Sequence, residues 1–515
     1  MNRRTLLQLL SSVALWPAAL PAWAQAGGGE PLPLGLNLAG FAYWSTEHPF
    51  SNLALGAANW RLQKDGASFT WDDPLPPMTD DGYPTIVPKG TTIESFLIFT
   101  PRRSHLPVQM SLLYDGKGRI GYLSGAELET RSPGRDEVRN LRNGGAFSVR
   151  LLETDPKNPV RNIRLYPRDK QPEGTFRPEF LQRLGGMQAL RFMDWMETNN
   201  SAVSNWDERP KKARFTQADG GVALEYMIEL ASTAKAAPWF TIPHLADDDY
   251  VTRCATLVKE TLAPELPVYV EYSNEVWNGQ FKQAEYARQR GLALGLSGND
   301  FEAQLRFYAQ RSSEVIAIWK KVFADQAERV RGVLAAQYAN DWTSETILSW
   351  KDAAAGAYAL AIAPYFGVSL GSPEQASEIS GWSLDRLFEA LGSEIDGENR
   401  TFVEKQAALA KRYGVKLIAY EGGQHLVGHA GAENNDKLTG LFQAANRDPR
   451  MGELYLRHLA HWQASGGGLY VLFNSMGEYT KWGSWGLLEA EGVPNAKWDA
   501  VQSLLADAGK PSGTK

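Results

Sequence analysis

The sequence contains a single cysteine, Cys254, among its 515 residues. No intramolecular disulfide can form, so the fold has to depend on its hydrophobic core for stability. Cys254 sits in the helical pattern YVTRCATLVKETL, where a buried, inert thiol is favoured over a nucleophile. The chain also lacks runs of Lys and Arg, and its net charge is −6. Composition therefore does not indicate a nucleic-acid partner or an anionic membrane.

Several catalytic motifs are missing as well. There is no GxSxG, so a serine esterase has no candidate nucleophile, and no Gly-rich phosphate loop follows a predicted strand. His425 and His429 lie in the Gly-rich stretch QHLVGHAGAENN without the Glu of HExxH, which disfavours a zinc peptidase. Calcium could bind at residues 247–249, but an Asp that caps the next helix is the favoured interpretation. We predict no cofactor and no metal.

The sequence does contain a composition typical of a globular protein, with 43% hydrophobic and 22% charged residues. The length allows one large α/β barrel with an extra module, or two to three smaller domains. Seventeen tryptophans are present. Most of them are expected to fill the core, but some can serve as stacking surfaces for a ligand.

The N-terminal segment MNRRTLLQLLSSVALWPAALPAWAQA reads as an export signal covering residues 1–24. It has the paired Arg3-Arg4, an apolar stretch, and a small-x-small ending at residues 22–24. The Arg pair suggests the twin-arginine route to the periplasm or the medium. A retained membrane anchor is the alternative, but Pro17 and Pro21 interrupt a short apolar run. No membrane insertion is expected after cleavage.

Beyond this segment, short apolar runs alternate with stretches of helical period. Eight runs have the character of strands buried on both faces; they begin near residues 34, 189, 237, 268, 330, 358, 415 and 468. Eight buried strands, each followed by a helix, predict a closed (β/α)8 barrel of the α/β class. We expect residues 25–64 to form the first barrel unit and residues 179–510 the remainder.

Residues 65–178 interrupt this alternation. They contain alternating segments such as TTIESFLIFT and GAFSVRLLE, separated by turns rich in Pro, Gly and Asp. The pattern predicts an inserted all-β, sandwich-like domain. Such an insert could bind carbohydrate, build one wall of the cleft, or be purely structural.

The fourth strand raises a question, because the buried run VYVEY continues directly into SNEVWN. In a (β/α)8 enzyme the C-terminal strand ends form the active site, so polar strand ends should converge there. The candidates at these ends are Arg191, His244, Asn274, Glu275, Tyr365 and Glu421. Two carboxyl groups facing each other across a cleft are what glycoside hydrolysis requires. A structural salt bridge across the barrel top is the alternative for Glu275 and Glu421.

An Asn-Glu pair that ends strand four and a Glu that ends strand seven resemble the retaining glycoside hydrolases of clan A, including family 5 cellulases and mannanases. The resemblance covers the barrel and not the insert. It implies that Glu275 is the acid/base and Glu421 the nucleophile. It also implies that Asn274 binds the sugar 2-hydroxyl and that Tyr365 orients the nucleophile.

The same resemblance implies that Arg191 and His244 hold the nucleophile ionised and so lower the pKa of Glu421. Two positions depart from the pattern of the clan. Val276 replaces the usual Pro after the Asn-Glu pair, and strand eight ends in Phe473-Asn474 where many members have a Trp. These departures leave the family within the clan and the substrate open.

Sugar rings present C–H faces that stack on aromatic side chains. The candidate substrate-binding residues are Tyr43, Trp44, Trp277, Trp482 and Trp485. The expected substrate is a neutral, β-linked oligo- or polysaccharide, such as a cellulose-like β-glucan. Two alternatives stay open: a glycan-binding protein on a degenerate barrel, and a transglycosylase that uses the same carboxylates.

Overall fold

The computed structural model describes residues 31–508, except 68–69, 71–72, 101–104, 142–144, 169–171 and 173. The predicted export signal, residues 1–24, lies outside the described residues. Among the residues described, no helix combines the length and apolar character needed to cross a bilayer.

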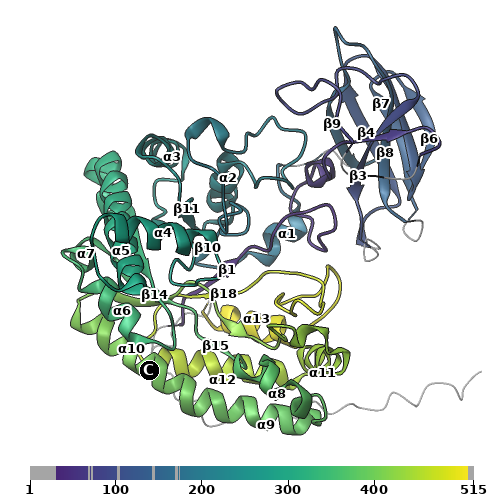
Figure 1. Ribbon diagram of the computed structural model, residues 1–515. Helices are drawn as coiled ribbons and strands as arrows, with labels where there is room; N and C mark the ends of the chain where they lie inside the picture. Colours follow the sequence, from purple (N-terminus) through teal and green to yellow (C-terminus); the bar gives the residue numbers. More distant parts are fainter. Residues whose placement is uncertain are drawn as a thin grey trace, which may run out of the picture.

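A closed barrel of eight parallel strands forms the larger part of the molecule (Figure 1). In barrel order the strands are β1 (Leu34–Asn37), β10 (Ala189–Arg191), β11 (Ala237–Ile242), β12 (Val268–Tyr272), β13 (Val330–Ala335), β14 (Ala359–Ile362), β16 (Lys416–Ala419) and β18 (Tyr470–Leu472). Strand β18 pairs with β1 and closes the barrel. The predicted (β/α)8 architecture and all eight predicted strands are confirmed.

Helices surround the strands on the outside (Figure 1). The α-helices are α1 (Pro178–Arg183), α2 (Leu224–Ala234), α3 (Asp248–Thr261), α4 (Lys282–Ala293), α5 (Asp300–Phe323), α6 (Asp341–Leu348), α7 (Ala353–Gly356), α8 (Pro373–Ile379), α9 (Leu384–Glu394), α10 (Arg400–Arg412), α11 (Asp436–Arg447), α12 (Arg450–Ala464) and α13 (Ala496–Ala508). A π-helical turn, η7 (Ile395–Asn399), joins α9 to α10. Two short strands, β15 (Tyr365–Phe366) and β17 (Gly423–Gln424), pair beyond the ends of β14 and β16.

Local sequence explains how these elements begin and pack. Asp247 caps α3, since its side chain accepts a hydrogen bond from the backbone N–H of Tyr250 at 2.7 Å, as the capping interpretation predicted. All six residues of β11 are buried, as expected of a strand covered on both faces. Gly332 in β13 lets α5 approach closely, because a Cβ there would lie 2.5 Å from a side-chain carbon of Ile316. The long helix α5 therefore packs directly on the sheet.

The predicted insert is a separate all-β unit beside the barrel (Figure 1). One antiparallel sheet has the order β2 (Arg61–Lys64), β3 (Thr91–Ile98), β8 (Phe147–Thr154), β5 (Gly118–Ser124). The other has the order β6 (Ala126–Ser132), β7 (Arg135–Asn140), β4 (Gln109–Asp115), β9 (Arg161–Pro167). Apolar residues from both sheets share one core, including Leu97 and Val149 from the first and Leu112 and Leu165 from the second. Because β2 pairs with β3, this unit begins before the expected residue 65.

The chain enters and leaves the β unit at one place. Phe50 and Phe176 form an antiparallel bridge, and the N–H of Ser51 donates to the carbonyl of Thr175 at 2.8 Å. The buried ring of Phe50 stacks on Trp195 of the barrel, with centroids 5.9 Å apart. The β unit is thus attached through two adjacent chain segments that the barrel core anchors.

Candidate active site

Glu275 and Glu421 line one cavity of about 520 Å³ at the C-terminal ends of the barrel strands. Glu275 follows β12, and Glu421 follows β16. The aromatic residues of the lining are Trp277, Phe281, Tyr338, Tyr365, Phe402, His425, Phe473 and Trp485. Among the described residues, the cavity wall contains four glutamates and no Lys or Arg. The site is thus apolar and aromatic with a concentration of carboxyl groups.

A tight turn after β12 places Glu275 in the cavity. Ser273 and Glu275 have φ angles of 59° and 42°, in the left-handed region that non-glycine residues adopt at a cost. Two hydrogen bonds hold this turn at the C-terminal end of β12. The N–H of Ser273 donates to the carbonyl of Ile242 at 2.7 Å, and the side chain of Gln283 donates to the carbonyl of Asn274 at 2.9 Å. The buried run VYVEY ends in polar residues because this turn presents them to the cavity.

Each carboxyl oxygen of Glu275 has its own hydrogen-bond donor. The hydroxyl of Tyr420 donates to Oε1 at 2.8 Å, and the side-chain amide of Asn278 donates to Oε2 at 2.9 Å. Burial raises the pKa of Glu275, and these two hydrogen bonds oppose that rise without cancelling it. Glu275 therefore holds a proton more readily than an exposed glutamate, as its predicted role as an acid requires.

Arg191 lies fully buried beneath the cavity and joins several polar groups. Its guanidinium contacts Glu271 at 2.9 Å, Glu421 at 3.3 Å and the side-chain oxygen of Asn274 at 2.8 Å. Glu271 also accepts a hydrogen bond from the indole N–H of Trp239 at 2.8 Å. One buried cation thus compensates two buried carboxylates, which alone would be very costly to bury.

The pKa of Glu421 is raised, which is contrary to the expectation from the sequence. Arg191 and His244 were expected to lower it, but it is raised to about 8 by burial first and by the charge of Glu275 second. Arg191 does lower it, although by less than these two effects raise it. His244 does not contribute, because it lies outside the cavity wall with its ring edge-on to Tyr286. Burial lowers the pKa of His244 itself, so its imidazole is neutral at neutral pH.

Tyr365 lies in the cavity wall, edge-on to Trp485 with ring centroids 5.9 Å apart. Burial, followed by the charges of Glu421 and Glu275, raises its phenol pKa well above the usual value. Tyr365 and Glu421 are both described by the structure, and no hydrogen bond joins the two side chains. Tyr365 is thus a neutral phenol beside both carboxyl groups.

The expected aromatic binding residues separate into two groups. Trp277 and Trp485 line the cavity. Tyr43 instead contacts the β unit, where it stacks on Phe96 with centroids 5.7 Å apart, and Trp44 is 58% exposed beside Tyr43. Trp482 is 64% exposed and lies outside the cavity wall. Tyr43, Trp44 and Trp482 therefore do not belong to the wall of this cavity.

Several residues of the site were not anticipated from the sequence, namely Glu271, Asn278, Tyr420 and Asn37, whose side-chain oxygen accepts a hydrogen bond from Arg191 at 3.2 Å. Glu271 had a detectable signal, since it is the one charged residue inside the apolar strand VYVEY. A charge at such a position requires a buried partner, and Arg191 supplies it. Tyr420 gave no signal, because an aromatic residue at a strand end is equally typical of the core.

No protein-family model and no curated protein matches the sequence. Among solved structures, it is similar to a 4-O-α-L-rhamnosyl-β-D-glucuronidase from Fusarium oxysporum 12S, with 13% identity over 63% of each chain and a TM-score of 0.37. It is also similar to a family 26 endo-β-1,4-mannanase from Cellulomonas fimi, with 11% identity over 63% of each chain and a TM-score of 0.33. A third is a GH5-4 broad-specificity endoglucanase from Clostridium acetobutylicum, with 10% identity over 65% of this chain and 91% of that chain and a TM-score of 0.35. This chain thus matches less than two thirds of the length of the first two proteins. Likeness of this extent assigns neither a family nor an activity.

Proposed function

We propose that the protein is a glycoside hydrolase that cleaves β-linked glycans with retention of anomeric configuration. Glu421 attacks the anomeric carbon, and Glu275 protonates the leaving oxygen and later activates water. One observation carries this proposal: two carboxyl groups with raised pKa values and different hydrogen-bond partners line the same aromatic cavity.

The reaction needs one proton on the pair before the first step. Because both pKa values are raised, the pair holds such a proton at neutral pH. The guanidinium of Arg191 contacts Glu421 and favours its ionised form, so we propose that the reactive form of the pair is the one in which Glu275 carries this proton. The hydroxyl of Tyr420 can act as donor or acceptor, so it can also accept a hydrogen bond from protonated Glu275.

The wall of the cavity supports a neutral substrate. Trp277 and Trp485 offer aromatic faces on which sugar rings can stack. Glu394 and Glu398 add two carboxyl groups to Glu275 and Glu421, and no Lys or Arg joins them among the described residues. A uronate or sulfated glycan would meet these carboxyl groups without a cationic partner, so we propose a β-glucan, mannan or other neutral polysaccharide.

Two hydrogen bonds fix the orientation of the Asn274 side chain. Its side-chain oxygen accepts from Arg191, and its amide donates to the side chain of Asn199 at 3.0 Å. The second amide hydrogen is available for a ligand, which supports the proposed contact with the sugar 2-hydroxyl.

The proposal is tested by screening β-glucans, mannans, xylans and galactans for released reducing ends. For the active substrate, an aryl glycoside with a good leaving group is then given to two variants. Glu275→Ala should still form the glycosyl-enzyme, and azide should release it as a β-glycosyl azide. Glu421→Ala should do neither, and equal azide rescue of both variants would contradict the assigned roles.

We also propose that the protein is exported, which the Arg3-Arg4 pair and the small-x-small sequence at residues 22–24 support. The mature chain should then begin near Gln25, which N-terminal sequencing of protein from the periplasm or medium can check. Recovery of the full-length chain alone would contradict export by cleavage.

A further inference from the structure

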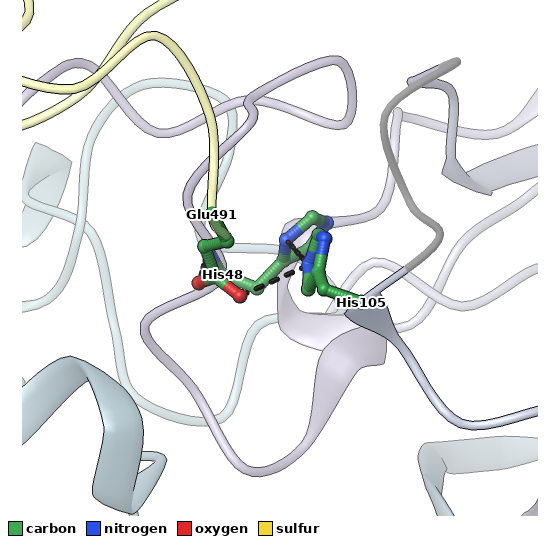
Figure 2. Close-up of side chains that lie close together, drawn as sticks. All are labelled: His48, His105 and Glu491. Carbon is green, nitrogen blue, oxygen red and sulfur yellow. Dashed lines mark hydrogen bonds and ion pairs between the residues drawn. The ribbon is translucent and has the colours of Figure 1, made fainter. Parts of the chain in front are cut away.

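A cluster of two histidines and a glutamate lies where the β unit meets the barrel, separate from the cavity just described. His48 lies between β1 and the 3-10 turn η2 (Leu53–Gly56), and His105 between β3 and β4 of the β unit. Glu491 lies between β18 and α13. Figure 2 shows the three side chains pointing toward one another from these three separate segments.

The spacing of the three side chains suits a small metal ion. The Nε2 of His105 lies 3.3 Å from the Nδ1 of His48 and 2.9 Å from Oε2 of Glu491, and one possible ligand atom from each residue lies within 4.8 Å of the others. Zinc binds imidazole nitrogen at about 2.0–2.1 Å, so two nitrogen ligands of a tetrahedral site lie about 3.3–3.4 Å apart. The two histidines thus have the separation that such a site requires.

Proton counting favours a cation over hydrogen bonds alone. The Nε2 of His105 can carry one hydrogen, yet it faces both the Nδ1 of His48 and the carboxylate of Glu491. A single hydrogen on this nitrogen can point straight at only one of these two neighbours, whereas one cation placed between the three residues can bind a ligand atom of each.

The charges around the cluster decide which class of cation fits. Arg177 and Arg183 contact Oε1 of Glu491 at 3.0 and 3.1 Å, and Arg183 also contacts Glu47 at 3.3 Å. Arg177 reaches Oε2 as well, at 2.8 Å, so an ion bound there would share that oxygen with Arg177. Two arginines balance two carboxylates, which gives little attraction for Ca²⁺ or Mg²⁺, ions that need several carboxylate oxygens. Two imidazoles and one oriented carboxylate are typical ligands of Zn²⁺.

We propose that His48, His105 and Glu491 bind a divalent transition-metal ion of the zinc type, which fixes the β unit against the barrel. Three protein ligands leave one coordination position for water. The arginines hold the far oxygen of Glu491 and so orient the near one, as partners of metal-binding carboxylates commonly do. This site is independent of the glycosidase activity proposed above.

The test uses the full-length chain, stripped of metal and titrated with Zn²⁺ in a calorimeter. The wild-type protein should bind one equivalent, and His105→Ala should weaken binding about 100-fold or more. His429→Ala is the matched control, because His429 is an exposed histidine outside the cluster and should not change the affinity. Chelation should lower the thermal midpoint of the wild type and of His429→Ala, but not that of His105→Ala.

Substitution with Co²⁺ keeps the test decisive if His105→Ala does not fold. Wild-type protein with one equivalent of Co²⁺ should show the intense visible absorption of a tetrahedral ion. Absence of stoichiometric binding, a weak octahedral spectrum, or unchanged affinity in His105→Ala would overturn the proposal. In that case the cluster is a metal-free contact between the two units.

Discussion

Glu275 and Glu421 share a cavity, but their neighbours give them different tendencies to ionise. Glu275 is contacted by two neutral donors, whereas Glu421 is contacted by the buried cation Arg191. Burial raises both pKa values. At the scale of the residue, proton placement on the pair is therefore the property that determines the proposed chemistry.

The pKa of Glu421 should depend on Glu275. In Glu275→Gln the charge that is the second largest cause of its raised pKa disappears, so the pKa should fall below about 8. Carbon-13 NMR titration of the labelled carboxyl groups measures this shift, with Glu394→Gln as a control that leaves Glu421 nearly unchanged. In the wild type, activity should decline as pH rises through about 8, where the pair loses its last proton. A pKa of Glu421 that stays at about 8 in Glu275→Gln would show that the two carboxyl groups are not coupled.

Replacing Arg191 should destabilise the barrel. Arg191→Met leaves Glu271 and Glu421 buried without their cation, and we expect a loss of about 3–5 kcal/mol in the free energy of unfolding. The carboxyl pKa values of the folded variant then rise further above those of the unfolded chain. The free energy of unfolding of Arg191→Met therefore falls as pH rises from the pKa of the carboxyl groups in the unfolded chain toward their raised pKa in the folded variant. Its difference from the wild type should thus be larger at high pH than at low pH.

Urea unfolding at several pH values measures the effect. Arg253→Met is the matched control, because Arg253 is 54% exposed in an ion pair with Asp249 and should change stability by less than about 0.5 kcal/mol. Equal losses in the two variants, or no dependence on pH, would contradict the assigned role of Arg191.

At the scale of the element, the start of α4 supports the turn that carries Asn274 and Glu275. Gln283 in this helix is fully buried and donates to the carbonyl of Asn274 and to the side chain of Asn199. Its oxygen accepts from the N–H of Asn200 at 3.0 Å. One glutamine thus connects the loop after β10 with the turn after β12.

Gln283→Leu should loosen this connection. It leaves buried polar groups without a partner, at about 1–3 kcal/mol each, and should lower kcat about 100-fold, because a displaced acid no longer aligns with the leaving oxygen. Gln289→Leu on the exposed face of the same helix is the control, with little effect expected. Urea unfolding and steady-state kinetics measure the free energy of unfolding and kcat of both variants. Equal values for Gln283→Leu and Gln289→Leu would mean that α4 does not position Glu275.

Hydrophobic period and strand-end polarity were sufficient to predict the barrel elements and the position of Glu275 and Glu421. They were not sufficient for β2, because the four residues RLQK are too short to show alternation. Tyr43 was misplaced for another reason: its contact with Phe96 comes from packing between the barrel and the β unit, which no local pattern shows. Side-chain direction at strand ends, as at Tyr420, likewise depends on the closed barrel and not on local pattern.

At the scale of the whole molecule, the β unit and the cavity are separate. Every residue of the cavity wall lies between Met193 and Trp485, and none of the described residues of the β unit belongs to it. The unit contacts the barrel at several places, among them the His48–His105–Glu491 cluster, the crossing beside Phe50 and the stacking of Trp60 on Phe215. We therefore expect the catalytic step to be independent of the β unit.

Deletion of residues 52–174 with a short Gly-Ser linker tests this expectation. The linker joins Ser51 to Thr175, which already share a hydrogen bond of 2.8 Å. Activity on a small aryl glycoside should be little changed, and binding to polysaccharide should weaken if the unit contacts glycan. Trp277→Ala is the comparison, with roughly tenfold loss expected on both substrates, because it removes a stacking surface from the cavity itself. A folded deletion variant that is inactive on the aryl glycoside would show that the β unit contributes to catalysis.

The stereochemistry of the first product tests the central claim most directly. Proton NMR, recorded within the first turnovers on a β-linked substrate and before mutarotation, identifies the anomer that the enzyme releases. If Glu421 is the nucleophile and Glu275 the acid/base, the first sugar formed is the β-anomer, and Glu421→Ala forms none. An initial α-anomer would contradict the account, because it requires direct attack by water and leaves Glu421 without its role as nucleophile.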